Sequence, residues 1–452
     1  MTIGAEPSLV RRKPVNRDWI GSIPQDWDSA LVKLVARLES GHTPSRSVPE
    51  YWQDCTIPWF SLADVWQLRK KGRKYVYDTS ELVSELGVAN SSARVLPTGT
   101  VMLSRTASVG FTGIMGRDMA TTQDFVNWVC GDKLLPEYLW YCLQAMKPEY
   151  ERLQFGSTHQ TIYMPDVAQF KIPVPSRGEQ ERIANFLDEQ TARIDALIAE
   201  KSRLHDALHE QIQALTYALV TRGLTNVRMK PTHVLWLGEV PEHWSVARIK
   251  HVARLESGHT PDKKVDAYWQ DCDIPWVSLN DTRSLLELDY ITETTSYINQ
   301  LGIDNSSARL LPAGTVFFSR DATIGRCGIA AIPMACSQHF IGWVCGTRLL
   351  PEYLLFVLRS MTAELERVTM GATLKTIGMD DVKGLSIPLP PLAEQRAIVG
   401  ETKGRRQQLE DLARHTAALV DRLREYRSSL ISAAVTGQLD IDALQAKLPK
   451  AA

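Results

Sequence analysis

Apolar residues recur in alternating steps of four and three along one stretch of the chain. From Ile183, eight of the eleven positions are apolar: Ile183, Leu187, Gln190, Ile194, Leu197, Lys201, Leu204, Leu208, Gln211, Leu215 and Ala218. This narrow heptad pattern is typical of a helix that packs along another helix. Neither Pro nor Gly occurs between Glu179 and Arg222, and Gly223 follows as a helix end requires. We expect one helix from Glu179 to about Thr221, roughly 60 to 65 Å long.

A second stretch repeats this frame and offers a partner of equal length. The same steps from Ile398 give Ile398, Thr402, Arg405, Leu409, Leu412, Thr416, Leu419, Leu423, Tyr426, Leu430 and Ala433. Two unrelated surface helices are the alternative, but the matching frames favour a pair within the chain. The residues expected to pair are Ile183, Leu187, Ile194, Leu197, Leu204, Leu208 and Leu215 with Ile398, Leu409, Leu412, Leu419, Leu423, Tyr426 and Leu430.

The two helices belong to two copies of one unit. The run VARLESGHTP at Val35 to Pro44 returns unchanged at Val252 to Pro261, and NSSAR at Asn90 returns at Asn305. YWQDC-x-IPW, WVCG, LLPEYL and IP-x-P also occur twice in the same order. Such identity at a period of about 215 residues indicates a tandem duplication.

Each copy places a mixed α+β domain before its long helix. Short runs rich in Val, Phe and Trp, such as Gly99 to Leu103 and Phe125 to Val129, predict strands, and Leu135 to Met146 predicts a short helix. Proline-rich joints connect domain and helix. The expected segments are a first domain at 1–175, a helix at 176–223, a second domain at 224–391, a helix at 392–440 and a tail at 441–452.

The copies differ mainly in one segment. Leu62 to Ala89 and Leu279 to Asp304 share almost no residues, although both flanks are nearly identical. A common scaffold with a divergent insert is what two readers of different ligands would have. Neutral drift in a surface loop is the alternative.

Composition limits the possible partners and compartments. The 452 residues carry 51 Lys and Arg against 52 Asp and Glu, so attraction to nucleic acid must come from local patches. Seven cysteines without a C-x-x-C pair argue against a disulfide framework and a Cys-ligated zinc. We expect a reduced, cytoplasmic protein, because no apolar run reaches the ~20 residues that a membrane span needs.

Motifs for catalysis are poorly represented. The chain has no Gly-rich phosphate loop, no Asn/Asp-Pro-Pro-Tyr/Phe box and no H-E-x-x-H. Glu401 with Lys403 could be half of a nuclease site, and His205 with His209 could share a metal, but a solvated helix face explains both better. His42 and His259 recur in the duplicated run, where a helix end or a loop closing on the core explains them as well as any chemistry does. We therefore expect no catalytic and no metal-binding residues.

Motifs for recognition are better represented. Each copy has a Ser-Arg turn followed by hydroxyl residues and Gly, and later a polar Gly-led loop; Arg and hydroxyl groups suit phosphates and base edges. The first divergent segment adds a basic run. The candidate DNA-binding residues are Arg69, Lys70, Lys71, Arg73, Lys74, Ser104, Arg105, Thr106, Ser108, Thr158, His159, Gln160, Ser319, Arg320, Asp321, Thr323, Thr373 and Lys375.

The order of these motifs resembles a known family. IPVPSRGEQERI at Ile172 to Ile183 and IPLPPLAEQRAI at Ile387 to Ile398 each join a globular domain to a long helix, and G-x-T-x-x-T-I-x-M-x-D-V precedes both. This arrangement is similar to the specificity subunit of type I DNA restriction-modification enzymes. The similarity runs from Trp19 to about Leu439.

The resemblance implies a function and a set of partners. Each domain would read one half of a bipartite, asymmetric site on double-stranded DNA, with the helices paired as an antiparallel coiled coil in a pseudo-twofold tandem repeat. Two methyltransferase subunits would bring S-adenosylmethionine, and restriction and translocase subunits would bring ATP and Mg, so the chain itself would hold no cofactor. Recognition for another nuclease system, or a coiled-coil scaffold that does not bind DNA, are the alternatives.

Overall fold

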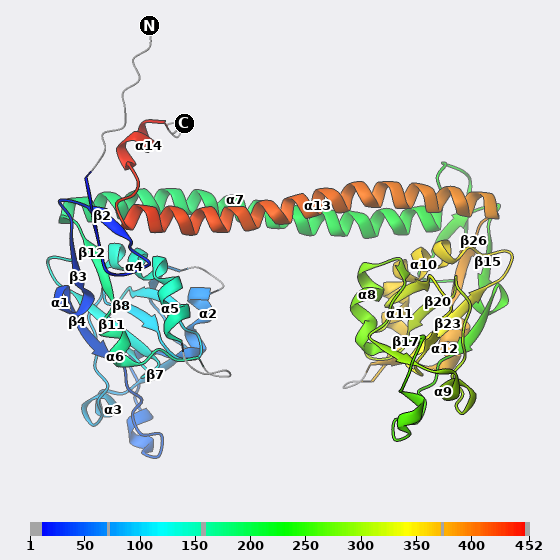
Figure 1. Cartoon of the computed structure of the whole chain (residues 1–452), viewed down its shortest axis with the longest axis horizontal. Helices are drawn as coiled ribbons and strands as arrows, with labels where there is room; N and C mark the ends of the chain where they lie inside the picture. Colours follow the sequence, from blue (N-terminus) through cyan, green and yellow to red (C-terminus); the bar gives the residue numbers. More distant parts are fainter. Residues whose placement is uncertain (1–10, 70–72, 155–159, 372–374, 448–452) are drawn as a thin grey trace, which may run out of the picture. The chain divides into compact units, whose positions relative to one another are not determined.

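The computed structural model describes residues 11–69, 73–154, 160–371 and 375–447 (Figure 1). The chain forms two compact units: unit 1 holds 1–201 and 418–452, and unit 2 holds 202–417. Each unit therefore contains one globular domain and half of each long helix. The boundaries expected from the sequence describe consecutive segments of the chain, whereas the compact units cut through both helices.

Unit 1 contains a five-stranded sheet in the order β4-β11-β8-β9-β6, a three-stranded sheet β10-β5-β7, and the pairs β1-β2 and β12-β3. Its domain elements are β1 (Arg12–Pro14), β2 (Ser22–Pro24), β3 (Asp28–Leu31), α1 (Val32–Val35), β4 (Ala36–Ser40), η1 (Pro49–Trp52), β5 (Ile57–Phe60), η2 (Leu62–Asp64), α2 (Trp66–Arg69), β6 (Tyr75–Val76), β7 (Glu81–Val83), α3 (Glu85–Ala89), β8 (Val101–Ser104), β9 (Thr112–Met115), β10 (Ala120–Thr121), β11 (Phe125–Cys130), α4 (Pro136–Ala145), α5 (Lys147–Leu153), α6 (Met164–Val167) and β12 (Lys171–Val174).

Unit 2 repeats both sheets as β16-β23-β20-β21-β18 and β19-β17-β22. Its domain elements are β13 (Met229–Pro231), β14 (Glu239–Pro241), β15 (Ser245–Arg248), η3 (Ile249–His251), β16 (Ala253–Ser257), η4 (Asp266–Tyr268), β17 (Ile274–Val277), η5 (Leu279–Asp281), α8 (Thr282–Glu287), β18 (Tyr290–Ile291), β19 (Ser296–Ile298), α9 (Gln300–Asp304), β20 (Val316–Ser319), β21 (Cys327–Ala330), β22 (Ala335–Cys336), β23 (Phe340–Cys345), α10 (Pro351–Ser360), α11 (Thr362–Val368), β24 (Thr369–Met370), β25 (Thr376–Ile377), α12 (Met379–Gly384) and β26 (Ser386–Leu389).

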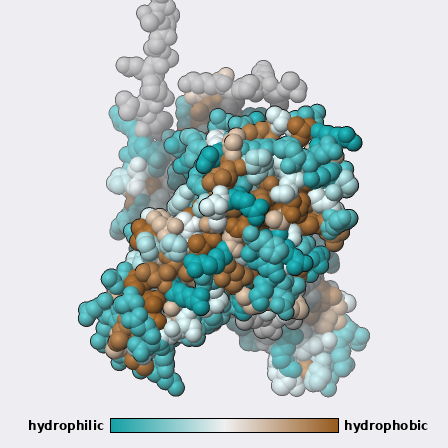
Figure 2. All heavy atoms as spheres, turned by 90° about the vertical axis from the view of Figure 1, so that its right-hand side faces the viewer, coloured by the Kyte–Doolittle hydropathy of each residue, from teal (hydrophilic) through white to brown (hydrophobic). Residues whose placement is uncertain are grey.

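The core of each domain lies between the five-stranded sheet, the domain helix α4 or α10, and the long helices. In unit 1 the apolar face of α4 packs Tyr138 and Leu139 against Val101 and Val126 of the sheet and Leu187 of the long helix. The strands β8 and β11 and the helix α4 confirm the elements predicted at these positions. Figure 2 shows one face of the molecule, on which hydrophobic patches are broken up by hydrophilic side chains.

The divergent segments form the same elements in both units. Residues 62–89 and 279–304 each contain a short 3-10 helix, an α-helix, two strands and a second α-helix. Buried Asp64 caps the first helix and accepts from the Ser80 backbone N–H at 2.7 Å, and Asp281 accepts from Thr295 in the same way at 2.6 Å. Because β6 and β18 are edge strands of the large sheets, the segments are part of the scaffold and not surface loops.

The proline-rich joints are strands that dock each long helix onto its own domain. β12 pairs antiparallel with β3, and β26 with β15. Gln180, fully buried at the start of the helix, donates to Lys133 O and Pro175 O and accepts from Leu135 N–H at 2.8 to 2.9 Å. Gln395 makes the equivalent three bonds in unit 2. The Gln of the duplicated E-Q motif thus fixes where each helix leaves its domain.

The long helices are α7 (Arg177–Arg222, 46 residues) and α13 (Leu392–Val435, 44 residues), and a short α14 (Ile441–Lys447) follows. Gly223, with φ +75°, ends α7 as expected. The halves pack antiparallel within each unit, since residue numbers rise along one helix as they fall along the other. Asp195 pairs with Arg427 at 2.8 Å in unit 1, and His205 Nδ1 lies 3.1 Å from Ala413 O in unit 2.

One row of the predicted seam is wrong by one residue, and five of the fourteen residues predicted to pair are exposed. The exposed fractions are 37% for Leu197, 40% for Leu204, 48% for Leu412, 40% for Leu419 and 58% for Tyr426. Six of the residues predicted to pair are buried: Ile183, Leu187, Ile194, Leu208, Ile398 and Leu430. Leu215, Leu409 and Leu423 are half-buried.

The true second row lies one position later on both helices. It includes buried Thr191, Ala413 and Val420, and half-buried Arg406 and Arg427, whose charges are paired with carboxylates. Small and ion-paired side chains let the backbones approach at this row. A count of apolar residues favours the neighbouring leucines instead, which explains the error.

A pair of leucine substitutions separates the two frames. The substitution Leu208→Ala should lower the free energy of unfolding by about 2 to 4 kcal/mol, because Leu208 is 4% exposed and the cavity left behind cannot fully collapse. Leu204→Ala, at a position 40% exposed, should cost well under half as much. Urea denaturation followed by circular dichroism measures both. Equal losses would contradict the shifted seam.

Candidate nucleic-acid interface

The Ser-Arg turn of each unit contains a strained alanine. Ala107 and Ala322 both have φ +58°, a left-handed conformation that costs energy for any residue with a Cβ. Each is held by a backbone bond to the second polar loop: Ala107 N–H donates to Gln160 O at 2.9 Å and Ala322 N–H to Lys375 O at 2.8 Å. The two loops predicted from the sequence are therefore joined directly.

The arginine of the turn holds a third segment. Arg105 N–H donates to Asp124 O at 2.9 Å, its Nε to Gln123 O at 3.1 Å, and its carbonyl accepts from Ile162 N–H at 2.9 Å. Arg320 repeats the two backbone bonds with His339 and Ile377. Much of the Arg105 guanidinium is thus committed to holding the loops together, and only part of it remains for a ligand.

The side chains on this common backbone differ between units. In unit 1, Thr122 donates to the Asp124 carboxylate at 3.0 Å. In unit 2, His339 replaces Asp124 and its Nδ1 lies 2.9 Å from the carboxylate of Asp321, which also accepts from Thr376. Ser319 and Thr323 hydroxyls lie 3.3 Å apart beside them. The same framework therefore presents different donors and acceptors.

The basic run of unit 1 divides between two surroundings. Arg69 donates to Ser108 Oγ at 2.9 Å and lies 4.8 Å from the Phe111 ring centre, so it joins the Ser-Arg turn. Lys74 instead contacts Asp188 of α7 at 2.6 Å with its side chain only 15% exposed. Lys74 is therefore a contact between domain and helix, and its role as a DNA ligand stays a prediction.

The remaining candidates are placed only in part. Arg73 is exposed and donates to Gln67 Oε1 at 3.3 Å. Five predicted residues lie outside the described residues: Lys70, Lys71, Thr158, His159 and Thr373.

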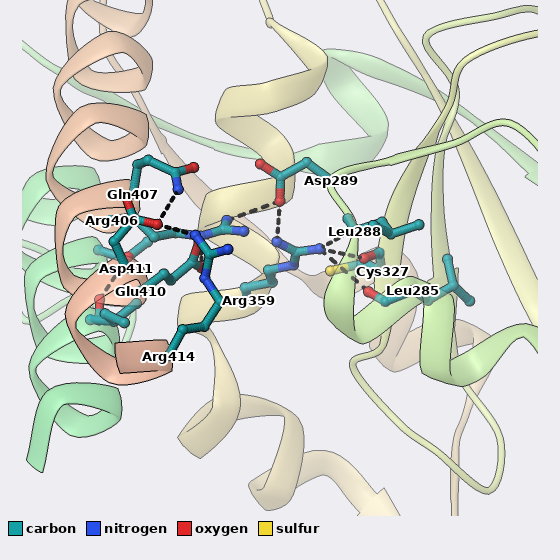
Figure 3. A network of polar contacts seen from close by, with 12 residues as sticks. Leu285, Leu288, Asp289, Cys327, Arg359, Arg406, Gln407, Glu410, Asp411 and Arg414 are labelled. Carbon is teal, nitrogen blue, oxygen red and sulfur yellow. Dashed lines mark hydrogen bonds and ion pairs between the residues drawn. The ribbon is translucent and has the colours of Figure 1, made fainter. Parts of the chain in front are cut away.

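Unit 2 has the same contact with the charges reversed (Figure 3). Asp289 occupies the position of Lys74 and pairs with Arg359 at 2.5 Å and with Arg406 of α13 at 2.9 Å. Burial alone would raise the pKa of the Asp289 carboxyl, but the two guanidinium groups outweigh it and hold the pKa below its ordinary value. We call the Lys74–Asp188 pair and the Asp289–Arg359–Arg406 triad the clamps of the two units.

A second set of charges is identical in the two units and was missed from the sequence. Glu39, mostly buried on β4, lies 3.2 Å from Arg37 and 3.0 Å from Arg94, whose side chains are 66% exposed. Arg254 and Arg309 flank Glu256 in the same way. These Arg and Glu residues lie inside the repeated runs VARLES and NSSAR, and that repetition is the sequence signal that could have revealed them.

The residues considered for catalysis or metal binding have other partners. His205 lies against the α13 backbone, Glu401 pairs with Arg405, and Lys403 lies 3.7 Å from Glu352. Across the described ranges, no group of three or more His, Cys, Asp or Glu side chains could hold a metal ion. In that same part of the chain, no helix is both long and apolar enough to cross a membrane.

Comparison with known proteins gives a consistent family. Residues 24–204 and 241–400 match the model of the type I restriction modification DNA specificity domain. The chain is 25% identical over 438 residues to the type I restriction enzyme MjaIX specificity subunit of Methanocaldococcus jannaschii, covering 94% of this chain and 96% of that one.

Two solved structures share the fold. A chain from a type I R-M system, solved to explain complex assembly and conformational transition, has a TM-score of 0.71 at 18% identity, covering 92% of this chain and 99% of that one. The HsdS subunit from Thermoanaerobacter tengcongensis has a TM-score of 0.55 at 19% identity, with 92% and 98% covered.

The clamp of unit 2 predicts a pH-dependent contribution to stability. Because the pKa of Asp289 is lowered, its charge stabilises the fold above the unfolded value of about 3.9 and stops doing so as the pH falls through the folded pKa. Asp289→Asn should lower the unfolding free energy by about 1.5 to 3 kcal/mol at neutral pH. The difference from the wild type should shrink below about pH 4.

Urea unfolding at a series of pH values measures this difference. Glu287→Gln is the matched control, because Glu287 pairs with Arg283 at the surface, where the two side chains are 54% and 86% exposed, and its loss should leave unfolding unchanged. A deficit in Asp289→Asn that stays constant down to the lowest pH at which the chain folds would contradict the assigned role.

Proposed function

Because the chain belongs to the type I restriction modification DNA specificity family, we propose that it reads a bipartite, asymmetric DNA site for a type I restriction-modification complex. The observation that carries the proposal is the duplication of one recognition framework with different side chains on it. The family model matches once in each half, and each match covers a domain and the start of a long helix. Two related domains on one chain suit a site with two unlike halves.

Residues that are identical in the two units and residues that differ suggest two kinds of contact with DNA. Phosphates are the same at every base pair, whereas base edges are not, so phosphate contacts tolerate identical residues and base contacts require different ones. The exposed pairs Arg37 with Arg94 and Arg254 with Arg309 are identical and suit phosphates. The positions of Thr106 and Asp124, which are Asp321 and His339 in unit 2, differ and suit bases.

The chemistry belongs to partner subunits in this proposal. Two methyltransferase subunits supply S-adenosylmethionine, and the restriction and translocase subunits supply ATP and Mg, while this chain contributes recognition and no catalysis. The Asn-Pro-Pro-Phe type of box that adenine methyltransferases use is missing from the sequence, which supports this division. The complex works in the cytoplasm, where these substrates are present.

The proposal predicts a methylation pattern. Expression with the neighbouring methyltransferase gene in a methylation-free host should produce a split motif with one N6-methyladenine in each half, on opposite strands. Single-molecule methylome sequencing detects it. If the complex assembles but no new methylation arises and the complex shows no salt-dependent binding to duplex DNA, a scaffold that does not bind DNA would be the better explanation.

A segment exchange tests which residues read the first half-site. Replacing 62–89 by 279–304 would bring Asp289 opposite Asp188 and repel it, so the donor segment should carry Asp289→Lys to restore the clamp of unit 1. This corrected exchange should change the first half of the methylated motif and leave the second unchanged.

The uncorrected exchange is the matched control. Its melting temperature should be about 2 to 4 °C below that of the corrected exchange, because like charges meet at the clamp. A corrected exchange that alters both halves, or neither, would refute the assignment of specificity to this segment.

A further inference from the structure

A cavity in unit 2 is walled by two tryptophans. The rings of Trp269 and Trp276 meet edge to face, 5.4 Å apart at 82°. Their N–H groups are both used, with Trp276 donating to His259 O at 3.1 Å and Trp269 to Asp262 O at 3.3 Å. The cavity they bound measures about 520 Å³, and its apolar lining residues are the two tryptophans and Leu279.

The same walls in unit 1 hold an internal guest. Trp52 and Trp59 have the same geometry, 5.3 Å apart at 71°, and the guanidinium of Arg46 lies 3.8 Å from the Trp52 ring centre. Glu81, opposite Trp59 on the neighbouring strand, pairs with Arg46 at 2.5 Å. A planar group thus already stacks on this ring in one copy of the site.

Unit 2 lacks both parts of that guest. Lys263 stands where Arg46 does, and Ser296, opposite Trp276, stands where Glu81 does. Among the described residues that line the cavity, none carries a carboxylate, while Lys263 adds a positive charge. A cationic guest such as an arginine from another protein would therefore find no counter-charge here. A neutral ring attached to a phosphate would find complementary charge.

Hydrogen-bonding groups are also available to such a ring. Ser337 lines the cavity and is 1% exposed, and its Oγ has no hydrogen-bond partner among the described residues. Its counterpart Thr122 is satisfied by Asp124, which unit 2 has exchanged for His339. Gln338 accepts from Thr260 through its amide oxygen, and its amide nitrogen lies 3.4 Å from His339 Nε2, so one amide hydrogen remains as a donor. A buried hydroxyl without a partner is costly unless a ligand completes it.

We propose that this cavity binds one nucleobase of the target DNA, turned out of the base stack. The ring stacks on Trp269, Ser337 and Gln338 bond to its edge, and Lys263 contacts the adjoining phosphate. The cavity adjoins the Ser-Arg turn, because His339 lines it and bonds to Asp321. The inference rests on the proposed function and assigns the extra base to the half-site read by unit 2.

A double substitution that copies unit 1 tests the inference. Lys263→Arg with Ser296→Glu places the internal guest over Trp269, without altering the core. The full chain is titrated calorimetrically with each of the four 2′-deoxynucleoside 5′-monophosphates. The wild type should bind one of them better than the others, and the double variant should bind it at least about tenfold more weakly. Ser337→Ala should reduce the preference among the four.

The mirror variant Arg46→Lys with Glu81→Ser is the matched control and should leave binding in unit 2 unchanged. Titration with N-acetyl-arginine amide tests the other guest. The inference fails if the wild type binds none of the nucleotides at millimolar concentration, if the double variant binds as the wild type does, or if the arginine compound binds in place of the nucleotides.

Methylome sequencing of the assembled complex separates this inference from the proposed function. The Lys263→Arg, Ser296→Glu variant should keep the first half of the motif and lose selectivity at one position of the second. An unchanged motif would overturn the cavity assignment and leave the proposed function standing. A wild-type complex that assembles and methylates no split motif would overturn the proposed function.

Discussion

A buried tyrosine in each unit joins the domain to the last turn of a long helix. Tyr138 donates to Pro173 O at 3.2 Å and to Val435 O at 3.0 Å, and Tyr353 bonds to Pro388 O and Val220 O in the same way. Helix C-terminal carbonyls have no partner within the helix, so a buried end must find one elsewhere. Together with Gln180 and Gln395, these bonds fix on each domain the start of one helix and the end of the other. The seam and the clamps depend on that arrangement.

The clamps show why the two domains are not interchangeable despite their common ancestry. Lys74 faces Asp188 in unit 1, whereas Asp289 faces Arg406 in unit 2. Opposite charges across a partly buried contact stabilise the right pairing, and like charges destabilise the wrong one. Divergence in the segment that begins at Leu62 or Leu279 therefore had to proceed together with changes on the helix it touches.

The sequence was sufficient to predict the features that follow from period and punctuation. The duplication, both long helices, the strands β8 and β11 and the helix α4 all depend on local patterns of apolar residues and on Gly or Pro at their ends. The Ser-Arg turn and the second polar loop were both identified because the two motifs recur in each copy, whereas the backbone bond that joins them is seen only in the structure.

The errors occurred where tertiary partners change the meaning of a residue. Arg406 and Arg427 occupy the helix seam because carboxylates neutralise them, and no hydropathy pattern records that. The contact of Lys74 with Asp188 could not be predicted either, because Asp188 is far away in sequence. The dissimilar segments were predicted as divergent inserts on a common scaffold, but their shared fold around buried Asp64 and Asp281 was not predicted.

The walls of the aromatic site show how a duplicated reader can acquire two specificities at low structural cost. Trp59 and Trp276 donate to the His carbonyl of the identical GHTP run, and Trp52 and Trp269 donate to backbone carbonyls just after it, so the ring positions do not depend on what lies between them. Exchanging Arg46 for Lys263 and Glu81 for Ser296 alters the occupant and leaves the wall intact. Recognition of a different ligand requires different contact residues, whereas the fold requires unchanged supporting residues. Specificity can therefore diverge at the few positions that contact the ligand and do not support the fold.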